Sequence, residues 1–244
     1  MEDNRTIDLN PKDALEQFKL AEMYKHGVGV EQSDELAFKW CLKASEGGNT
    51  TAQYELGNMY LYGQGVEHSN ENAVKWFQKA SDNGNNKAKL ELACCYEVGQ
   101  GVEENFDMFI KLIKELAEDN VPEAQLVLAH VYEDGQGVEK SDDLAMELYV
   151  KAAAQNNVDA MYELASHYYY GICTDLDYKK AFEWFFKGKE LGDEKSEHMV
   201  GVCYLFGQGV EKDRELAVMT FTKLSNQNYQ ESKKMLNKIR YGLI

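Results

Sequence analysis

A segment of 36 residues, residues 52–87, recurs before and after itself along most of the chain without an insertion. Each copy holds a stretch with apolar residues at helical spacing, a Gly-x-Gly break, a second such stretch, and a Gly or Asn stop. Repeats of about 20 to 50 residues are typical of solenoids, in which each unit packs only on its neighbours. The period therefore predicts an all-α solenoid built from helix-turn-helix units.

Six copies follow one another in register and form a single predicted repeat domain. We place them at residues 16–51, 52–87, 88–123, 124–159, 160–195 and 196–231. Residues 1–9 are expected to fray. Asn10 and Pro11 suit the cap and the first residue of the first helix, which we expect to end at His26. Residues 232–244 are predicted to hold a basic helix that caps the C-terminal end of the array.

The first helix of each copy carries a recurrent tyrosine, and a small residue precedes it by three positions. The tyrosines are Tyr24, Tyr60, Tyr96, Tyr132, Tyr168 and Tyr204. The small residues are Ala21, Gly57, Ala93, Ala129, Ala165 and Gly201. A small residue at a fixed helical position lets a second helix approach closely.

A Gly-x-Gly break follows each tyrosine except in the fifth copy, which has Gly171 but Cys173. Glycine adopts the left-handed backbone that ends a helix without strain from a Cβ. Such loops also suit phosphate, but an acidic residue follows every break and would repel an anion. These residues are Glu31, Glu67, Glu103, Glu139, Asp175 and Glu211. They suit either a ladder for a cation or basic partner, or a row of solvated loop ends, and we favour the solvated row.

The second helix of each copy begins and ends at recognisable residues. The predicted N-caps are Ser33, Ser69, Asn105, Ser141, Asp177 and Asp213. The predicted left-handed stops are Gly48, Gly84, Asn120, Asn156, Gly192 and Asn228. Between them an alanine precedes a large residue by three positions, as in Ala73 and Trp76. We expect this pair to be buried, so that Trp76→Ala would cost about 3–5 kcal/mol.

These motifs resemble the Sel1-like repeat family over residues 16–231. In the second copy the matching residues are Ala52, Leu56, Gly57, Tyr60, Gly63, Gly65, Val66, Ala73, Trp76, Lys79 and Ala80. Tetratricopeptide repeats are similar in architecture but lack the Gly-x-Gly-Val. The resemblance implies a right-handed superhelix of antiparallel helix pairs and a role as a protein-binding scaffold or adaptor. Some relatives are cysteine-rich, secreted and reported to bind penicillin. This chain lacks their paired cysteines, so those properties are not transferred.

Composition favours a basic protein partner. The net charge of −16 argues against nucleic acids and anionic membrane surfaces. The sequence shows no signal peptide and no apolar run long enough to span a membrane, so we expect a cytoplasmic protein. The odd number of cysteines, five, favours free buried thiols over a disulfide framework.

A stripe on the first helices, opposite the recurrent positions, is predicted to line a concave groove that binds the partner. Its residues are Tyr54, Asn58, Leu61, Tyr62, Leu90, Glu97, Leu126, His130, Glu133, Asp134, Tyr162, Ser166, Tyr169, Tyr170, Leu205 and Phe206. Exposed aromatic groups flanking carboxylates are typical of protein contact. For Tyr54, Leu90, Leu126 and Tyr162 packing against the next repeat is an equal alternative. The groove would take a peptide, helix or loop with apolar anchors and a Lys or Arg.

No constellation of catalytic or metal-binding residues emerges from the sequence, and we predict no enzyme activity, cofactor or metal. His130, His167 and His198 fall on successive first helices but at three different helical positions. Cys94 and Cys95 are adjacent, which is not a redox spacing.

The favoured function is therefore a non-catalytic interaction scaffold. An inhibitor or immunity-type protein that sequesters a cognate toxin or enzyme is the alternative. A hydrolase, by analogy with the cysteine-rich relatives, ranks below both. We expect a monomer or weak oligomer, with stacking of the basic cap on an acidic body as the route to self-association.

Overall fold

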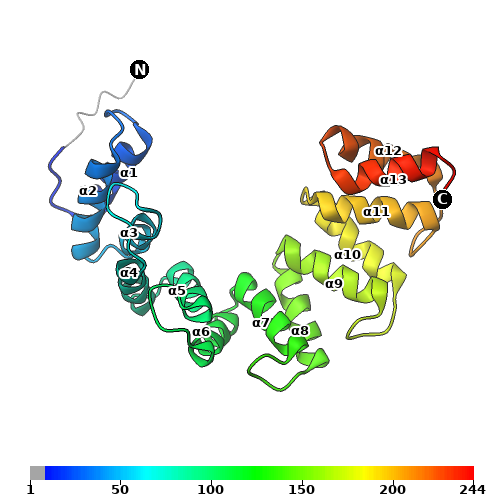
Figure 1. Cartoon of the computed structure of the whole chain (residues 1–244), viewed down its shortest axis with the longest axis horizontal. Helices are drawn as coiled ribbons and strands as arrows, with labels where there is room; N and C mark the ends of the chain where they lie inside the picture. Colours follow the sequence, from blue (N-terminus) through cyan, green and yellow to red (C-terminus); the bar gives the residue numbers. More distant parts are fainter. Residues whose placement is uncertain (1–8) are drawn as a thin grey trace. The chain divides into compact units, whose positions relative to one another are not determined.

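The computed structural model describes residues 9–244 of the chain, and within them every regular element is an α-helix (Figure 1). The helices are α1 Ala14–His26, α2 Asp34–Glu46, α3 Thr50–Tyr62, α4 Asn70–Asp82, α5 Asn86–Val98, α6 Phe106–Glu118, α7 Pro122–Asp134, α8 Asp142–Ala154, α9 Val158–Tyr170, α10 Tyr178–Glu190, α11 Glu194–Phe206, α12 Arg214–Asn226 and α13 Gln230–Arg240. The predicted all-α repeat architecture is confirmed.

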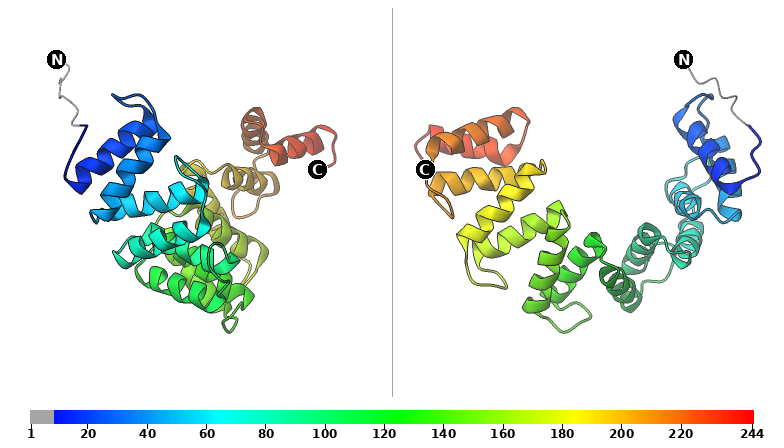
Figure 2. Two further views of the ribbon diagram at one scale, coloured as in Figure 1. Left: turned by 60° about the vertical axis from the view of Figure 1, so that its left-hand side comes forward. Right: turned by 180° about the vertical axis from the view of Figure 1, so that it is seen from behind.

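The chain forms two compact units, one up to Leu116 and the other from Ala117 onward. Within each unit a helix packs on the helices before and after it in the sequence, as α3 does on α2 and α4. Two further views show the same succession inside each unit (Figure 2). Each unit is therefore a stack of helix pairs held together by contacts between sequence neighbours.

The loop inside each pair is closed by backbone groups. The N–H of the residue that caps the second helix donates to the carbonyl of the recurrent tyrosine, as from Ser69 to Tyr60 at 2.9 Å. The first loop glycine, such as Gly63 at φ 67°, is left-handed and ends the first helix. The second glycine abuts the preceding pair, because a Cβ on Gly65 would clash with the carbonyl of Asp34. The predicted backbone role of the Gly-x-Gly break is confirmed.

The predicted caps and stops of the second helices are also confirmed. Ser33, Ser69, Ser141, Asp177 and Asp213 accept N–H groups of the first helical turn, and Asn105 accepts the N–H of Met108. All six predicted stops have positive φ, from 59° at Asn120 to 90° at Gly192. Three of them are asparagine, which tolerates this conformation better than other residues with a side chain.

The large buried residue of the second helix is one position later than predicted. Trp40 is buried, but Trp76 and Trp184 are only half-buried, with the Lys79 and Lys187 amines 4.7 Å and 3.8 Å from the ring centres. We call the residues at one equivalent position of the six copies a column. The fully buried column of the second helices consists of Cys41, Phe77, Ile113, Tyr149, Phe185 and Phe221. Its rings lie against the small residues of the first helix, and a Cβ on Gly57 would clash with Phe77. The prediction that small residues permit close helix approach is confirmed.

Both ends of the array differ in detail from expectation. Helix α1 begins at Ala14, not Pro11, because the Asp13 carboxylate accepts the N–H groups of Leu15 and Glu16. Pro11 is buried outside the helix, so its predicted helical role was wrong. Residues 1–8, where fraying was expected, lie outside the described residues. At the C-terminal end, the predicted capping helix is present as α13, which begins at Gln230, two residues before the predicted segment.

The cysteines are free thiols, but not all are buried. Cys41, Cys95 and Cys203 are buried, whereas Cys94 is exposed and Cys173 is half-buried. The expectation of buried free thiols is thus correct for three residues and wrong for Cys94 and Cys173.

Two adjacent residues of α4 test the revised core. Phe77→Ala should lower the free energy of unfolding by about 3–5 kcal/mol, because it opens a cavity at a fully buried site. Trp76→Ala should cost less, because the indole keeps partial contact with water. Chemical denaturation followed by circular dichroism measures both variants. A larger loss for Trp76→Ala would contradict this assignment of the core.

Candidate interaction surface

The stripe predicted to bind a partner does not form one uniformly exposed surface. Six of its residues are exposed, namely Tyr62, Glu97, His130, Asp134, Tyr170 and Phe206. Nine are half-buried, namely Tyr54, Asn58, Leu61, Leu90, Leu126, Glu133, Tyr162, Ser166 and Tyr169. Leu205 is only 2% exposed and lies in the hydrophobic core, so it contributes nothing to an interaction surface.

Several half-buried members pack within the fold. The ring of Tyr54 lies 6.0 Å from that of Phe77, and the ring of Tyr162 lies 5.6 Å from that of Phe185, measured between centroids. The Tyr169 hydroxyl donates to Gln208, and burial is the main cause that raises its pKa to about 12. These tyrosines stabilise the fold, and the packing alternative applies to Tyr54 and Tyr162, although their partner is the same pair rather than the next repeat.

Four of the exposed apolar residues lie at the last position of a first helix, just before the left-handed glycine. Tyr62 is 69% exposed, Val98 65%, Tyr170 60% and Phe206 48%. Asp134 takes this position in α7. Because equivalent positions of stacked pairs form a row, Asp134, Tyr170 and Phe206 lie along one edge of the second unit. We call these three residues the helix-end row.

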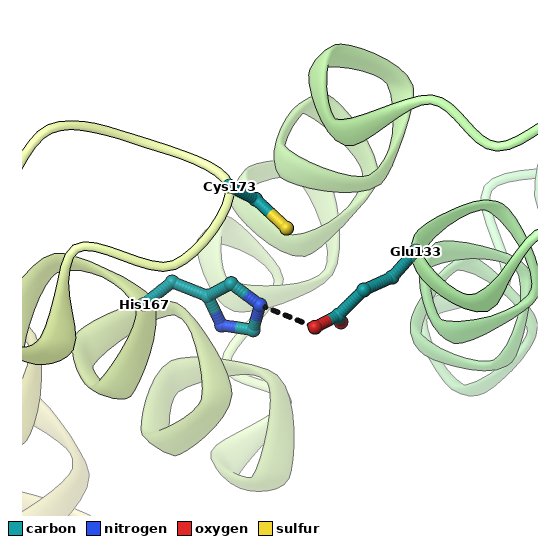
Figure 3. A group of neighbouring side chains, drawn as sticks. All are labelled: Glu133, His167 and Cys173. Atoms are coloured by element: carbon teal, nitrogen blue, oxygen red, sulfur yellow. Dashed lines mark ion pairs between the residues drawn. The ribbon is translucent and has the colours of Figure 1, made fainter.

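A second group of polar side chains meets inside the second unit, around Glu133 of α7 (Figure 3). The hydroxyl of Tyr149, on α8, donates to Glu133 Oε2 at 2.6 Å. Nε2 of His167, on α9, lies 3.2 Å from Glu133 Oε1. Nδ1 of His167 lies 2.7 Å from the Glu163 carbonyl, and the His130 ring packs on Tyr149 with centroids 5.4 Å apart. We call Glu133, Tyr149 and His167 the Glu133 cluster.

The environment of the Glu133 cluster favours an ionised carboxylate. Burial acts to raise the pKa of Glu133, but the hydrogen bond from Tyr149 and the neighbouring His167 outweigh it, so that this pKa lies below its ordinary value. Burial and the same hydrogen bond raise the pKa of Tyr149. The tyrosine therefore remains a donor, and the carboxylate remains charged, at neutral pH.

Sequence reasoning placed Glu133 and His130 on an open binding stripe and missed the cluster. The signal was present in the repeat columns. His167 occupies a buried column otherwise filled by Met59, Cys95, Val131 and Cys203. Tyr149 occupies the buried column that contains Phe77, Phe185 and Phe221. A polar group in an apolar column requires a partner, and Glu133 supplies one to both Tyr149 and His167.

The comparisons with known proteins agree with this architecture. The sequence matches the Sel1 repeat family at residues 17–49, 50–85, 86–108, 122–157, 158–193 and 195–229. The chain belongs to the Sel1 repeat family. The resemblance drawn from the sequence is confirmed. Sel1 repeat proteins are protein-interaction scaffolds, and the fold of the family is generally non-catalytic.

Solved structures of other Sel1 repeat proteins are similar over nearly the whole chain. The protective antigen c5321 of uropathogenic Escherichia coli is 29% identical, with a TM-score of 0.86 over 95% of this chain and 50% of that one. A Sel1 repeat protein from Oxalobacter formigenes is 26% identical, with a TM-score of 0.85 over 93% of this chain and 66% of that one. This chain thus spans half of the first relative and less than two thirds of the second.

A more distant likeness concerns the fold alone. The immunity protein PA5088 of Pseudomonas aeruginosa is 19% identical, with a TM-score of 0.53 over 88% of this chain and 82% of that one. No curated protein is significantly similar to the chain. Among the described residues, no helix is long and apolar enough to cross a membrane.

The hydroxyl of Tyr149 provides a test of the Glu133 cluster. Tyr149→Phe installs the residue of the equivalent repeats and should lower the free energy of unfolding near pH 7 by about 1.5–3 kcal/mol, the contribution of a hydrogen bond to a charged group. The folded pKa of Glu133 is lowered, so its contribution is complete above the unfolded pKa of about 4.3 and is lost as the pH falls through the folded value. The difference from the parent protein should therefore shrink below about pH 4.

Thermal and urea unfolding at several pH values measure this difference. Tyr62→Phe, at an exposed tyrosine, is the matched control and should leave stability unchanged. A loss for Tyr149→Phe that does not depend on pH would contradict the role of the carboxylate.

Proposed function

We propose that the protein is a non-catalytic scaffold that binds a protein or peptide through the exposed ends of its first helices. The observation that carries the proposal is the helix-end row, where Tyr170 and Phe206 are 60% and 48% exposed at equivalent positions. Large aromatic side chains in water are typical anchors of protein contact. Within the stripe predicted from sequence we choose this edge as the binding surface, because the other members of the stripe are largely packed within the fold.

The charge of the same edge favours a basic partner. Asp134 belongs to the row, and the loop after each first helix carries an exposed acid, as at Glu139, Asp175 and Glu211. The net charge of the chain is −16, so a partner with Lys or Arg groups beside apolar anchors would be attracted and oriented. Because these acidic loop residues lie beside exposed aromatic residues, we favour a role in binding a basic partner over the alternative that they are only solvated loop ends.

An inhibitor that sequesters one cognate toxin or enzyme is the narrower alternative. Likeness in fold to an immunity protein is compatible with it but carries no role by itself. One basic protein recovered in equimolar amount and inactive in the complex would favour the inhibitor. Several partners that remain active would favour the adaptor.

The helix-end row is tested by affinity capture from native lysate with the immobilised full chain. Tyr170→Ser combined with Phe206→Ser should abolish capture of the basic partner while the helical content is unchanged. Leu144→Ser combined with Met219→Ser is the matched control, because these apolar residues are 43% and 66% exposed on the second helices α8 and α12. Rising salt should weaken capture by the parent chain.

Cross-linking with mass spectrometry then locates the contact. Cross-links are expected near the C-terminal ends of α9 and α11. Equal capture by both double variants, or cross-links confined to the second helices, would contradict the proposal.

A further inference from the structure

Cys173 adds a third departure from the repeat beside the Glu133 cluster. It stands where the other copies have Gly29, Gly65, Gly101, Gly137 and Gly209, and it keeps their left-handed backbone at φ 56°. A residue with a Cβ is rarely held there, and such strain is typical of functional sites. The loop after α9 brings Cys173 to the side chains of Glu133 and His167, and all three point toward one another (Figure 3).

We propose that Glu133, His167 and Cys173 form a binding site for a divalent transition metal ion of the zinc class. The ligands would be a carboxylate oxygen of Glu133, Nε2 of His167 and Sγ of Cys173. Carboxylate, imidazole and thiolate are the three donor types that zinc takes in proteins. Three protein ligands leave a fourth position open.

The hydrogen bonds of His167 prepare it to be a ligand. A carbonyl oxygen only accepts, so Nδ1 carries the hydrogen that it donates to the Glu163 carbonyl at 2.7 Å. Nε2 is thereby the ligating nitrogen, as in metal sites where the second nitrogen is held by a backbone carbonyl. His167 is only 4% exposed, and within residues 9–244 Nε2 forms no hydrogen bond but lies in ion-pair contact with Glu133.

An ionised carboxylate faces this nitrogen. Glu133 Oε1 lies 3.2 Å from Nε2, which would be repulsive for a neutral imidazole with its lone pair toward the oxygen. Either a proton on Nε2 or a cation between the two groups removes the repulsion. A proton would leave the nearby Cys173 thiol without a role, whereas a metal ion would take it as a third ligand. This difference favours the metal ion.

The distances suit tetrahedral coordination after a small adjustment. Zinc bonds of about 2.0–2.3 Å place neighbouring ligand atoms about 3.3–3.6 Å apart. The nitrogen and oxygen already lie 3.2 Å apart, and all three ligand atoms lie within 4.8 Å of one another. The sulfur therefore needs to move on the order of 1 Å, within reach of a side-chain rotation.

A pocket lies beside Cys173, and a further side chain supports Glu133. A pocket of about 430 Å³ reaches Cys173 and is lined by Met146, Val150, Tyr168 and Thr174 among others. The Tyr149 hydroxyl holds Glu133 Oε2 and so orients the carboxylate from the second shell of ligands. Two anionic ligands and a neutral imidazole would balance the charge of a divalent ion.

Binding requires loss of the thiol proton. Burial first, and then a hydrogen bond with Asp142, raise the pKa of Cys173 to about 11 in the metal-free protein. The ion would form a bond to sulfur and release this proton to solvent, so affinity should rise with pH. Calorimetric titration in buffers of different ionisation enthalpy counts the released proton.

Cobalt(II) absorption on the reduced full chain tests the site directly. One equivalent should produce a near-ultraviolet band from thiolate-to-metal charge transfer, and zinc should displace it. Cys173→Gly and His167→Met restore residues found at the same positions of other copies, so both variants should fold. Each should lose the band and bind zinc more than about 100-fold more weakly, beyond the effect typical of second-shell changes.

Two controls separate coordination from folding. Cys94→Ser removes an exposed thiol of α5 and should leave the band and the affinity unchanged. Zinc should raise the melting temperature of the parent chain but not of Cys173→Gly. An absent band, a band that survives Cys173→Gly, or a melting temperature that zinc does not change would overturn the proposal. The contact between His167 and Glu133 would then be an ion pair without a metal ion.

Discussion

The close contact between a loop glycine and the helix of the preceding pair governs the stacking in several copies, the fifth copy with Cys173 being an exception. At Gly65, Gly101 and Gly209 an added Cβ would meet the backbone carbonyl of Asp34, Asn70 or Tyr178. Because this contact joins backbone to backbone, it is independent of the side chains around it. The remaining positions can vary from copy to copy while the spacing of the pairs is kept, and this freedom is what allows one fold to present different surfaces.

Much of this architecture could be predicted from the sequence, because it depends on what the backbone alone requires. Left-handed residues need Gly or Asn, and helix starts need side-chain acceptors, so loops, caps and stops were located residue by residue. The predicted core position of the second helix was one residue too early, because Trp76 and Phe77 are adjacent and both apolar. Trp76 lies under the Lys79 amine, and this pairing allows a large ring to remain half in water.

The candidate surfaces were harder to predict, because exposure depends on how helices are rotated against each other. Tyr54 and Tyr170 belong to the same predicted stripe, yet one packs on Phe77 and the other is in water. The Glu133 cluster requires contacts between three helices that no single repeat reveals. Comparison of columns, rather than of motifs, would have found it, since His167, Tyr149 and Cys173 each break a column that is otherwise apolar or glycine.

The cluster joins α7, α8 and α9, and therefore crosses the boundary between two successive helix pairs. In a linear stack, unfolding that starts at an end advances one pair at a time, and each boundary is a separate step. The contacts of Glu133 with Tyr149 and His167 add to the work of separating α9 from the pair before it. When the second unit is pulled from its C-terminal end, α13, α12, α11 and α10 would peel away first, and the chain would hold at α9 until the force can separate His167 from Glu133.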